Sequence, residues 1–594
     1  MKIRDIVPVA LGKQKADVLI KNGKIVNVFT GRVEEGNIAL FRKRIAGIGD
    51  YTEGREVIDV KGGYVVPGFI DAHLHIESSM VAPREFARAV LPKGTTTVIA
   101  DPHEITNVLG LAGLEYMIHS TEGIPLNVYI ALPSAVPATT FETSGARLGP
   151  EDMVSTVDKY PRRIIALGEV MNFPGVLNVD NELITKIEIL RHEYKKIDGH
   201  APGLTGKDLN AYITGFIRSD HECTTAEEAL EKVGRGMQVL VREGTAAKNL
   251  EAIVKIVDMA NHSFFSFCTD DREPIDIIQE GHIDFLIRKA IGLGLDPIIA
   301  LRMATVNTTR HYNLRSMGAI APGYKADMVV VGDLKRFDIK MVIKDSKVVA
   351  ERGAVAAPVT GLHEDLPEQL GGVHLGEYGP ETFRIPVPAA DGEPQTAEGG
   401  NAAPGDTRPR PRIRVIGMRE GDLYTDSLEE EAAVRDGYAV ADAGRDLAKV
   451  VVFDRYRAEK VARAFAKGFG VVRGAAATTI GHDAHNLAVM GMSDEDMYAA
   501  VRRVQELNGG IVVVIDGKVE AELPLPIAGL MSNADLDTVV EKLGGIKKAI
   551  GKMGTKKDIL MPLHFIQLAV IPELKLTDFG LVNIGRQEIL DLWV

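Results

Sequence analysis

The chain has 594 residues, of which 45% are apolar and 25% charged, and its net charge is −13. These proportions are typical of a soluble globular protein with several domains, and without a basic stripe they disfavour nucleic-acid binding. Its two cysteines, Cys223 and Cys268, exclude a disulfide framework and fit a reducing cytosol. Because no stretch approaches the ~20 apolar residues of a membrane span, we expect a cytoplasmic protein without a membrane partner.

Short strands with tight turns are predicted from about residue 17 to 66. Asn22-Gly23 lies between two apolar runs, and Asn-Gly is a strong signal for a hairpin turn. Residues 326–350 have the same β-rich character. The sequence therefore predicts two small β-rich pieces, one on each side of a longer central region.

A pair of histidines closes the next strand candidate. The run Tyr64–Ile70 is rich in β-formers and leads into His73-Leu74-His75. Residues i and i+2 of a strand point to the same face, so both imidazoles can reach one point in space. Converging imidazoles are typical of Zn, Mn, Fe, Ni or Cu sites.

Seven further strand candidates follow, and most of them end just before a polar side chain. Helix-compatible stretches such as Pro83–Leu91 and Ala226–Val233 separate most of them. Eight strands alternating with helices over about 240 residues predict a (β/α)8 barrel, whose active site gathers at the carboxyl ends of the strands. The seven candidates are 95–100, 127–131, 163–168, 196–199, 211–214, 239–241 and 264–268.

Six side chains of the metal-ligand type fall at the carboxyl ends of these predicted strands. Four imidazoles and two carboxylates suit a two-metal site, in which ions about 3.5–4 Å apart share a hydroxide. Glu169 could bridge the two ions, and Asp270 could bind one ion and accept the hydroxide proton. Taken singly, each residue keeps a structural alternative, such as a helix N-cap for Asp270. The six are His73, His75, Glu169, His200, His221 and Asp270.

The C-terminal third is predicted to form a separate α/β domain. Helix candidates are Arg457–Phe465 and Met497–Leu507, and Gly510–Ile515 is a strand candidate that ends at the turn Asp516-Gly517. His482 and His485 are two histidines three residues apart. They could belong to a third metal site, or they could be packed polar residues, because no third ligand is evident nearby.

A segment of low complexity precedes this domain. Residues 386–412 consist largely of Pro, Gly, Ala and charged residues with few apolar anchors. This composition predicts a mobile surface loop or linker. A basic docking site at Arg408, Arg410 and Arg412 is the alternative.

Several motifs together resemble the amidohydrolase superfamily and, within it, the adenine deaminase family. The superfamily pattern rests on Pro-Gly-Phe-Ile-Asp-Ala-His-Leu-His together with the single histidines at 200 and 221 and Asp270. Glu169 stands where many superfamily members carry a carboxylated lysine. The more specific motifs are Asp-Pro-His-Glu (101–104), Gly-His-Ala-Pro-Gly (199–203), Ser-Asp-His-Glu (219–222), Cys-Thr-Asp-Asp-Arg (268–272), Gly-His-Asp-Ala-His-Asn (481–486) and the run 523–531.

The resemblance implies hydrolysis of adenine to hypoxanthine and ammonia, as in purine salvage, at a binuclear centre. It implies two divalent ions, with manganese preferred and iron or zinc as alternatives. It also implies that the two β-rich pieces form one small sandwich beside the barrel, and that the protein is a homo-oligomer, with a dimer favoured.

Four residues receive roles in the reaction on adenine. Asp270 is assigned as the base, and Glu104, with His103 beside it, as the second acid or base, because their loop follows the second strand of the barrel. Alternatively, Glu104 only starts the following helix, where the dipole favours carboxylates. Ser134, which follows the third strand, is assigned to substrate binding.

Two rival functions stay open at this stage. A cyclic amide hydrolase of the same superfamily would have a similar site, but such relatives normally carry a lysine on the fourth strand. A non-catalytic binding protein on this fold would have lost metal ligands. The predicted domains are 1–66 and 311–360 (sandwich), 67–310 (barrel), 361–412 (linker with insertion) and 413–594 (C-terminal α/β domain).

Overall fold

A computed structural model describes residues 2–363, 367, 370–388, 411–419 and 421–594. Most of the insertion predicted at 386–412, including Arg408 and Arg410, lies outside the described residues. The chain forms two compact units, of which the first comprises Met1–Pro102, Glu115–Ser134 and Gly149–Leu366. The second comprises His103–Leu114, Ala135–Leu148 and Pro367–Val594. Among the described residues, no helix has both the length and the hydropathy needed to cross a bilayer.

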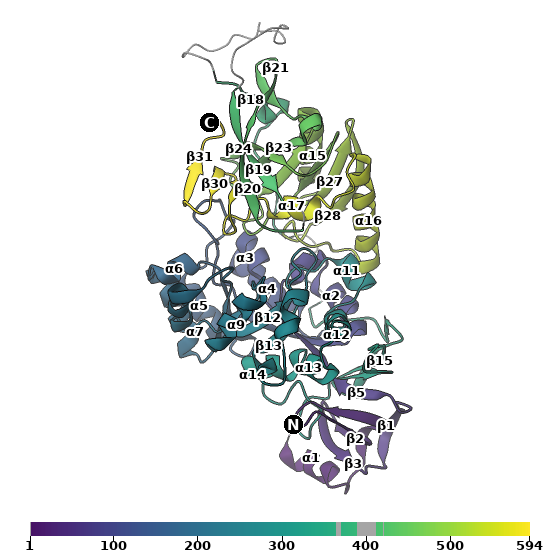
Figure 1. The fold of residues 1–594 in the computed structure, drawn as a ribbon. Coiled ribbons are helices and arrows are strands. Elements are labelled where there is room, and N and C mark those ends of the chain that lie inside the picture. Colours follow the sequence, from purple (N-terminus) through teal and green to yellow (C-terminus); the bar gives the residue numbers. More distant parts are fainter. Residues whose placement is uncertain (1, 364–366, 368–369, 389–410, 420) are drawn as a thin grey trace. The chain divides into compact units, whose positions relative to one another are not determined.

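The two β-rich pieces join in one nine-stranded sheet of the first unit, part of which Figure 1 shows near the N-terminus. The predicted hairpin turn at Asn22-Gly23 is wrong. Asn22, at φ +60°, lies inside a continuous strand whose register is irregular there, and the chain reverses only after Asn27. The strands are β1 (Ala16–Asn27), β2 (Arg32–Phe41), β3 (Arg44–Gly49), β4 (Gly54–Asp59), β5 (Tyr64–Pro67), β14 (Met328–Val331), β15 (Ile339–Lys344), β16 (Lys347–Glu351) and β17 (Ala354–Val355).

Eight parallel strands form the rest of the first unit, as a curled five-stranded sheet and a three-stranded sheet. The five-stranded sheet has the order β10-β9-β8-β7-β6, and the other has the order β11-β12-β13. Successive parallel strands require crossover connections, which helices supply here. The strands are β6 (Phe69–Leu74), β7 (Thr95–Ala100), β8 (Asn127–Leu132), β9 (Ile164–Val170), β10 (Lys196–Gly199), β11 (Ser219–Asp220), β12 (Gln238–Arg242) and β13 (Phe265–Cys268).

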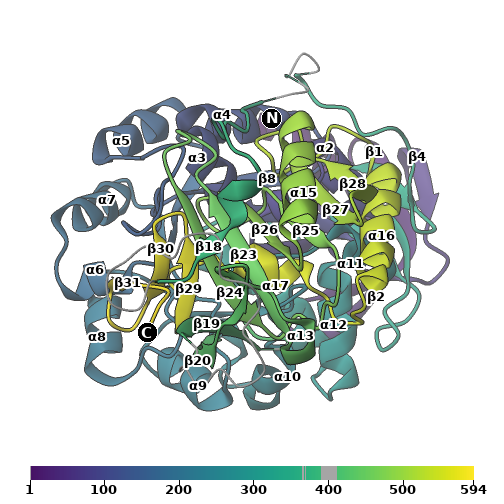
Figure 2. The same ribbon diagram turned by 90° about the horizontal axis from the view of Figure 1, so that it is seen from above.

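Helices cover the outside of these strands, and several line the outer edge of the unit in Figure 2. The predicted helices at 83–91 and 226–233 are present as α2 and α9. The predicted strand at 211–214 is wrong, because it lies in α8, where Leu209, Tyr212 and Ile213 are buried at helical spacing. The helices include α2 (Pro83–Val90), α5 (Pro150–Lys159), α7 (Asn181–His192), α8 (Gly206–Thr214), α9 (Ala226–Gly234), α12 (Ile283–Gly292) and α13 (Pro297–Met303).

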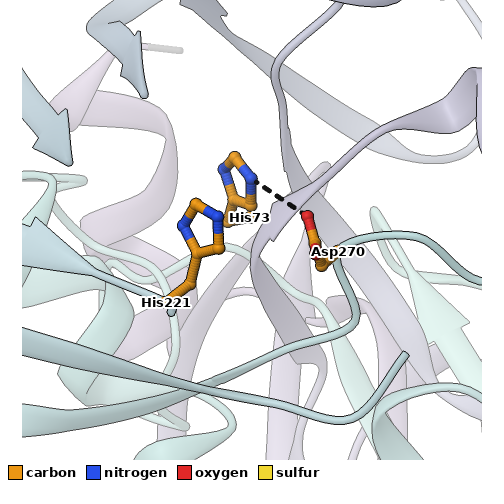
Figure 3. Close-up of side chains that lie close together, drawn as sticks. All are labelled: His73, His221 and Asp270. Carbon is orange, nitrogen blue, oxygen red and sulfur yellow. Dashed lines mark ion pairs between the residues drawn. The ribbon is translucent and has the colours of Figure 1, made fainter. Parts of the chain in front are cut away.

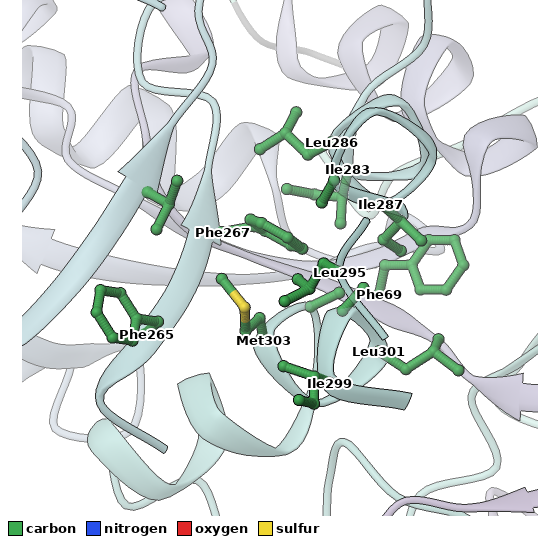
Figure 4. Close-up of a cluster of buried hydrophobic side chains, with 14 of the residues drawn as sticks. Phe69, Phe265, Phe267, Ile283, Leu286, Ile287, Leu295, Ile299, Leu301 and Met303 are labelled. Atoms are coloured by element: carbon green, nitrogen blue, oxygen red, sulfur yellow. The ribbon is translucent and has the colours of Figure 1, made fainter. Parts of the chain in front are cut away.

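A large apolar core lies between the strands and the helices of the first unit (Figure 4). Phe69 from β6 and Phe265 and Phe267 from β13 are fully buried there, beside Ile283 and Leu286 from α12. Burial of a large apolar side chain contributes about 1.5–3 kcal/mol, so this core fixes the strands whose ends carry the predicted ligands.

The second unit is built on an eight-stranded sheet with the order β20-β19-β24-β23-β26-β25-β27-β28. Strands follow one another before α15 (Asp494–Glu506), so strands and helices do not alternate in this part of the unit. The predicted helix 457–465 is wrong, because Val461–Lys467 form strand β24. The strands are β19 (Arg412–Met418), β20 (Thr425–Glu431), β23 (Leu447–Phe453), β24 (Val461–Lys467), β25 (Ala475–Thr478), β26 (Leu487–Gly491), β27 (Gly510–Ile515) and β28 (Lys518–Pro524).

Two helices pack against this sheet. Met497 and Val501 of α15 join Val512 and Val514 of β27 in one buried cluster, and α16 (Leu536–Lys552) packs beside β28. Figure 2 shows α15 and α16 next to these strands. The helix predicted at 497–507 and the strand predicted at 510–515 are therefore both present.

Candidate metal centre

The six predicted ligands meet at the carboxyl ends of parallel strands in the first unit. His73 lies in β6 and Glu169 in β9. His75, His200 and His221 directly follow β6, β10 and β11, and Asp270 lies two residues after the end of β13. All six side chains are buried. Residues from six points in the sequence therefore face one another, as the alternation of strands and helices predicted.

The Glu169 carboxylate lies between two pairs of imidazoles. Its Oε1 atom is 3.6 Å from His73 Nε2 and 3.4 Å from His75 Nε2. Its Oε2 atom is 2.6 Å from His200 Nδ1 and 3.2 Å from His221 Nε2. Each oxygen thus faces its own pair, and one carboxylate can serve two cations.

Asp270 adds a second carboxylate to the first of these pairs. Its Oδ1 atom is 3.5 Å from His73 Nε2 and 3.1 Å from His75 Nε2. Figure 3 shows Asp270 beside His73, whose ring stacks on that of His221 with centroids 4.3 Å apart. The arrangement offers His73, His75 and Asp270 to one cation and His200 and His221 to another.

Hydrogen bonds fix the ring of His75 in a form that suits a cation. His75 Nδ1 is 2.8 Å from the carbonyl oxygen of Asp101, which can only accept a hydrogen bond, so Nδ1 carries the proton. The lone pair of neutral His75 therefore lies on Nε2, which faces the carboxylates. Metal-binding histidines characteristically donate their other N–H in this way.

Two imidazole ring atoms of this centre have no hydrogen-bond partner within the described part of the chain. They are the Nε2 atoms of His73 and His200, both deeply buried. An unpaired buried polar atom costs free energy. A cation near His73 Nε2 would satisfy that atom, so the donor set fits a divalent ion such as Mn, Fe or Zn.

Buried charges of both signs surround this centre. Burial opposes the charged form of His73, but the carboxylates of Asp270 and Glu169 outweigh it and raise the His73 pKa to about 10. Burial also opposes the charge on His200, but Glu222 and Glu169 raise its pKa to about 9. Burial would raise the pKa of Glu169, yet His221 and the other imidazoles hold it well below its usual range. The carboxylates thus require positive charge beside them.

Arg242 and Glu222 are part of this cluster, although neither residue was assigned a role from the sequence. Arg242 Nη1 donates to Asp270 Oδ2 at 2.8 Å, and Arg242 Nη2 donates to Glu222 Oε2 at 2.9 Å. Glu222 Oε1 lies 3.4 Å from His221 Nε2. The available signals were the position of Arg242 at the end of a predicted strand and that of Glu222 in Ser-Asp-His-Glu.

Ser134 lies near Glu169. Its hydroxyl donates to the backbone oxygen of Glu169 at 2.5 Å, and its own backbone oxygen accepts from Lys186 Nζ at 3.3 Å. The side chain thus supports the segment that carries Glu169. Its assignment to substrate binding stays a prediction.

His103 and Glu104 lie in the second unit, at the start of helix α3 (His103–Leu109). Glu104 Oε1 accepts from His482 Nδ1 at 2.7 Å and lies 3.3 Å from His103 Nε2. Glu104 Oε2 pairs with His485 Nε2. The sequence did not identify this partner for the two C-terminal histidines, because 378 positions separate Glu104 from His482.

The contacts among Glu104, His482 and His485 fit a hydrogen-bond network better than a metal site. The Gly481 N–H donates to His485 Nδ1 at 3.2 Å, so Nδ1 is unprotonated and the proton of neutral His485 lies on Nε2, toward Glu104. Burial would raise the pKa of Glu104, but His482, His485 and His103 hold it well below its usual range. Glu104 is therefore a carboxylate that accepts imidazole protons.

Two family models match the chain. The amidohydrolase family matches residues 64–349, which contain all six residues of the centre, and the adenine deaminase C-terminal domain matches residues 422–588.

Relatives of similar length match almost the whole chain. It is 58% identical to the adenine deaminase of Thermosipho africanus over 100% of both chains. It is 55% identical to the adenine deaminase of Kosmotoga olearia, over 100% of this chain and 99% of the other. Identity to the adenine deaminase of Methanothrix thermoacetophila is 42%, over 98% of each chain.

Proposed function

Because the chain belongs to the adenine deaminase family, within the amidohydrolases, we propose that it hydrolyses adenine to hypoxanthine and ammonia. The observation that carries this proposal is the Glu169 carboxylate, with one oxygen toward His73 and His75 and the other toward His200 and His221. Neither rival function is favoured, because the fourth strand carries no lysine at this position and every predicted ligand is present.

The proposed centre holds two divalent ions, with manganese preferred and iron or zinc as alternatives. His73, His75 and Asp270 would hold one ion, His200 and His221 the other, and Glu169 both. Two bound ions would lower the pKa of a water molecule enough to supply a hydroxide near neutral pH.

A closed (β/α)8 barrel is the proposed frame of this site. Between the two parallel sheets, Arg218 N donates to Ile197 O at 2.9 Å on one side. On the other side, Asp270 N donates to His73 O at 3.1 Å. These hydrogen bonds support closure at both seams. In that fold the active site gathers at the carboxyl ends of the strands.

Asp270 is the proposed base. Attack at C6 of adenine requires that the water lose its protons and that the amine gain one before it leaves as ammonia. Arg242 holds Asp270 Oδ2, so Oδ1 is the oxygen that accepts the proton of the attacking water and returns it to the amine. A well-placed acid or base of this kind contributes about 10²–10⁴-fold in rate.

Glu104 and His103 are proposed to handle the second proton, which must reach a ring nitrogen. They directly follow Asp101-Pro102 at the end of β7, and the carbonyl of Asp101 holds His75. The Glu104 carboxylate lies 3.3 Å from His103 Nε2, so a proton on that imidazole would face a negative charge. We therefore assign the proton itself to an imidazole and its stabilisation to Glu104.

A substrate screen of the manganese-loaded protein tests the proposal. Adenine, adenosine, cytosine and dihydroorotate are followed by absorbance and ammonia release. We expect turnover of adenine and little or none of adenosine. Comparable rates on adenosine would reject the assignment to adenine, and release from dihydroorotate alone would favour a cyclic amide hydrolase.

Further proposals concern the organisation of the protein. We retain domains at 1–66 and 311–360, 67–310, 361–412 and 413–594, a role in purine salvage, and a homo-oligomer with a dimer favoured. A cytoplasmic location is proposed because Cys223 and Cys268 are both free thiols.

A further inference from the structure

Lys232 is a fully buried lysine of helix α9, with 0% of its side chain exposed. Its ammonium group donates to three oxygens: Ala201 O at 2.7 Å, Asp220 Oδ2 at 3.0 Å and Glu228 Oε1 at 2.7 Å. A buried charge is costly unless it is paired and hydrogen-bonded, and here all three ammonium protons have acceptors. The three acceptors therefore hold the Lys232 ammonium group in one place.

The partners of Lys232 belong to the two segments that carry the second pair of imidazoles. Ala201 directly follows His200, and Asp220 directly precedes His221. Asp220 Oδ1 also accepts from Ala201 N at 2.7 Å. Lys232 and Asp220 thus bind both the N–H and the carbonyl oxygen of the residue next to His200.

Glu228, one turn before Lys232 on the same helix, repeats this connection. Its Oε1 atom accepts from Gly203 N at 2.9 Å, and its Oε2 atom accepts from Thr224 N at 3.1 Å. Gly203 lies three residues after His200 and Thr224 lies three residues after His221. One helix therefore ties together both segments.

We propose that Lys232, with Asp220 and Glu228, positions His200 and His221 relative to each other and so sets the affinity of the second metal position. The inference rests on the proposed function. Metal sites need ligands within about 0.5 Å of the productive geometry, and β11, with two residues, is too short to fix His221 alone.

The test is a titration of metal-free Lys232→Met with Mn²⁺ alone, with bound metal measured directly. We expect one of the two ions to bind about 10–100-fold more weakly, which is the usual loss when support of a ligand is removed. The other ion should bind as in the wild type. Metal content after dialysis should then fall from about two ions to about one.

The matched control is Lys344→Met. Lys344 is also buried, and it pairs with Asp327 at 3.3 Å and Asp345 at 3.2 Å, in the nine-stranded sheet. It should lower stability without changing either Mn²⁺ affinity. If Lys232→Met does not fold, Glu228→Gln, which keeps an acceptor oxygen and loses the charge, should show a weaker loss at the same position.

The outcomes separate the two proposals. A wild-type protein that binds two Mn²⁺ ions, with Lys232→Met or the fallback variant Glu228→Gln binding both equally well, overturns the positioning role alone. A wild-type protein that binds no Mn²⁺ overturns the proposed metal centre and the positioning role with it.

Discussion

Asp270 is held through both of its carboxylate oxygens. Oδ1 faces His73 and His75, while Oδ2 accepts from Arg242, which also holds Glu222. Burial would raise the pKa of Asp270, but Arg242 and the imidazoles keep it well below its usual range. The guanidinium thus keeps Asp270 ionised and directs one oxygen to the site.

Arg242→Gln should therefore destabilise the protein strongly. It leaves Glu222 and Asp270 buried without their common cation, and breaking a buried pair costs about 3–5 kcal/mol. The loss is measured by urea unfolding of the metal-free protein. Arg242→Gln combined with Glu222→Gln should recover part of it, because one of the uncompensated charges is then gone. A double variant no more stable than the single one would contradict this account.

Glu104→Gln should lower kcat by about 10²-fold or more with both metals retained. The amide cannot accept protons from His482 and His485 on both sides, and it no longer stabilises a protonated His103. Turnover and metal content are measured together. Glu151→Gln, at the exposed start of α5, is the control and should be silent. Near-normal turnover would reduce Glu104 to a helix-start carboxylate, and loss of metal would make it a ligand.

At the scale of elements, the sequence predicted most of the parallel strands because each is a short apolar run followed by a polar residue. The prediction failed where local composition favours one secondary structure and tertiary packing stabilises another. Ala211–Thr214 looks β-like, but Tyr212 and Ile213 are the inward face of α8. The true sixth strand, Ser219–Asp220, is polar and only two residues long. No periodicity exists over two residues, so only the fold reveals it.

For the candidate site, too, the sequence predicted some residues and missed others. Residues directly at the ends of predicted strands, such as Glu169 and His200, were found from their position alone. Arg242, Glu222 and Lys232 were not, because their importance lies in what they contact across long sequence separations, which spacing does not encode.

Helix α8 contributes to the site through Tyr212. Its hydroxyl donates to Val170 O at 2.7 Å and accepts from His200 N at 3.0 Å. Tyr212→Phe leaves both backbone groups without this partner, so we expect a loss of about 1–3 kcal/mol, measured as the urea midpoint. Tyr194→Phe is the control, because Tyr194 is 92% exposed and should be neutral. Equal effects of the two changes would contradict the role of the Tyr212 hydroxyl.

At the scale of the whole molecule, each of the two units holds a histidine cluster, and the two clusters differ in their chemistry. The cluster in the first unit has imidazole lone pairs directed at carboxylates, as His75 shows. The cluster in the second unit has an imidazole N–H directed at a carboxylate, as His485 shows. We therefore expect only the cluster in the first unit to bind metal ions.

Chelation followed by hydrogen exchange tests this difference. A ligand at 100 times its Kd stabilises the folded state by about 2.7 kcal/mol, so removal of metal should speed exchange in peptides that contain His73–His75, His200–Ala201 and Asp220–His221. Peptides covering 481–486 should exchange at the same rate with and without metal. Equal acceleration in both places would mean that the second cluster also binds metal.

The path of the chain through the two units has a consequence for biosynthesis. Helix α3 and the segment Ala135–Leu148 belong to the second unit but leave the ribosome long before its remainder, which begins at Pro367. Domains generally fold in order of their synthesis. The early segments of the second unit, however, cannot complete their unit until the segment that begins at Pro367 has been synthesised. Glu104 must wait for His482 and His485, and until they arrive its carboxylate lacks two of its imidazole partners. A chain cut anywhere between Leu148 and Pro367 would separate the pieces of the second unit, so neither product would carry that unit whole.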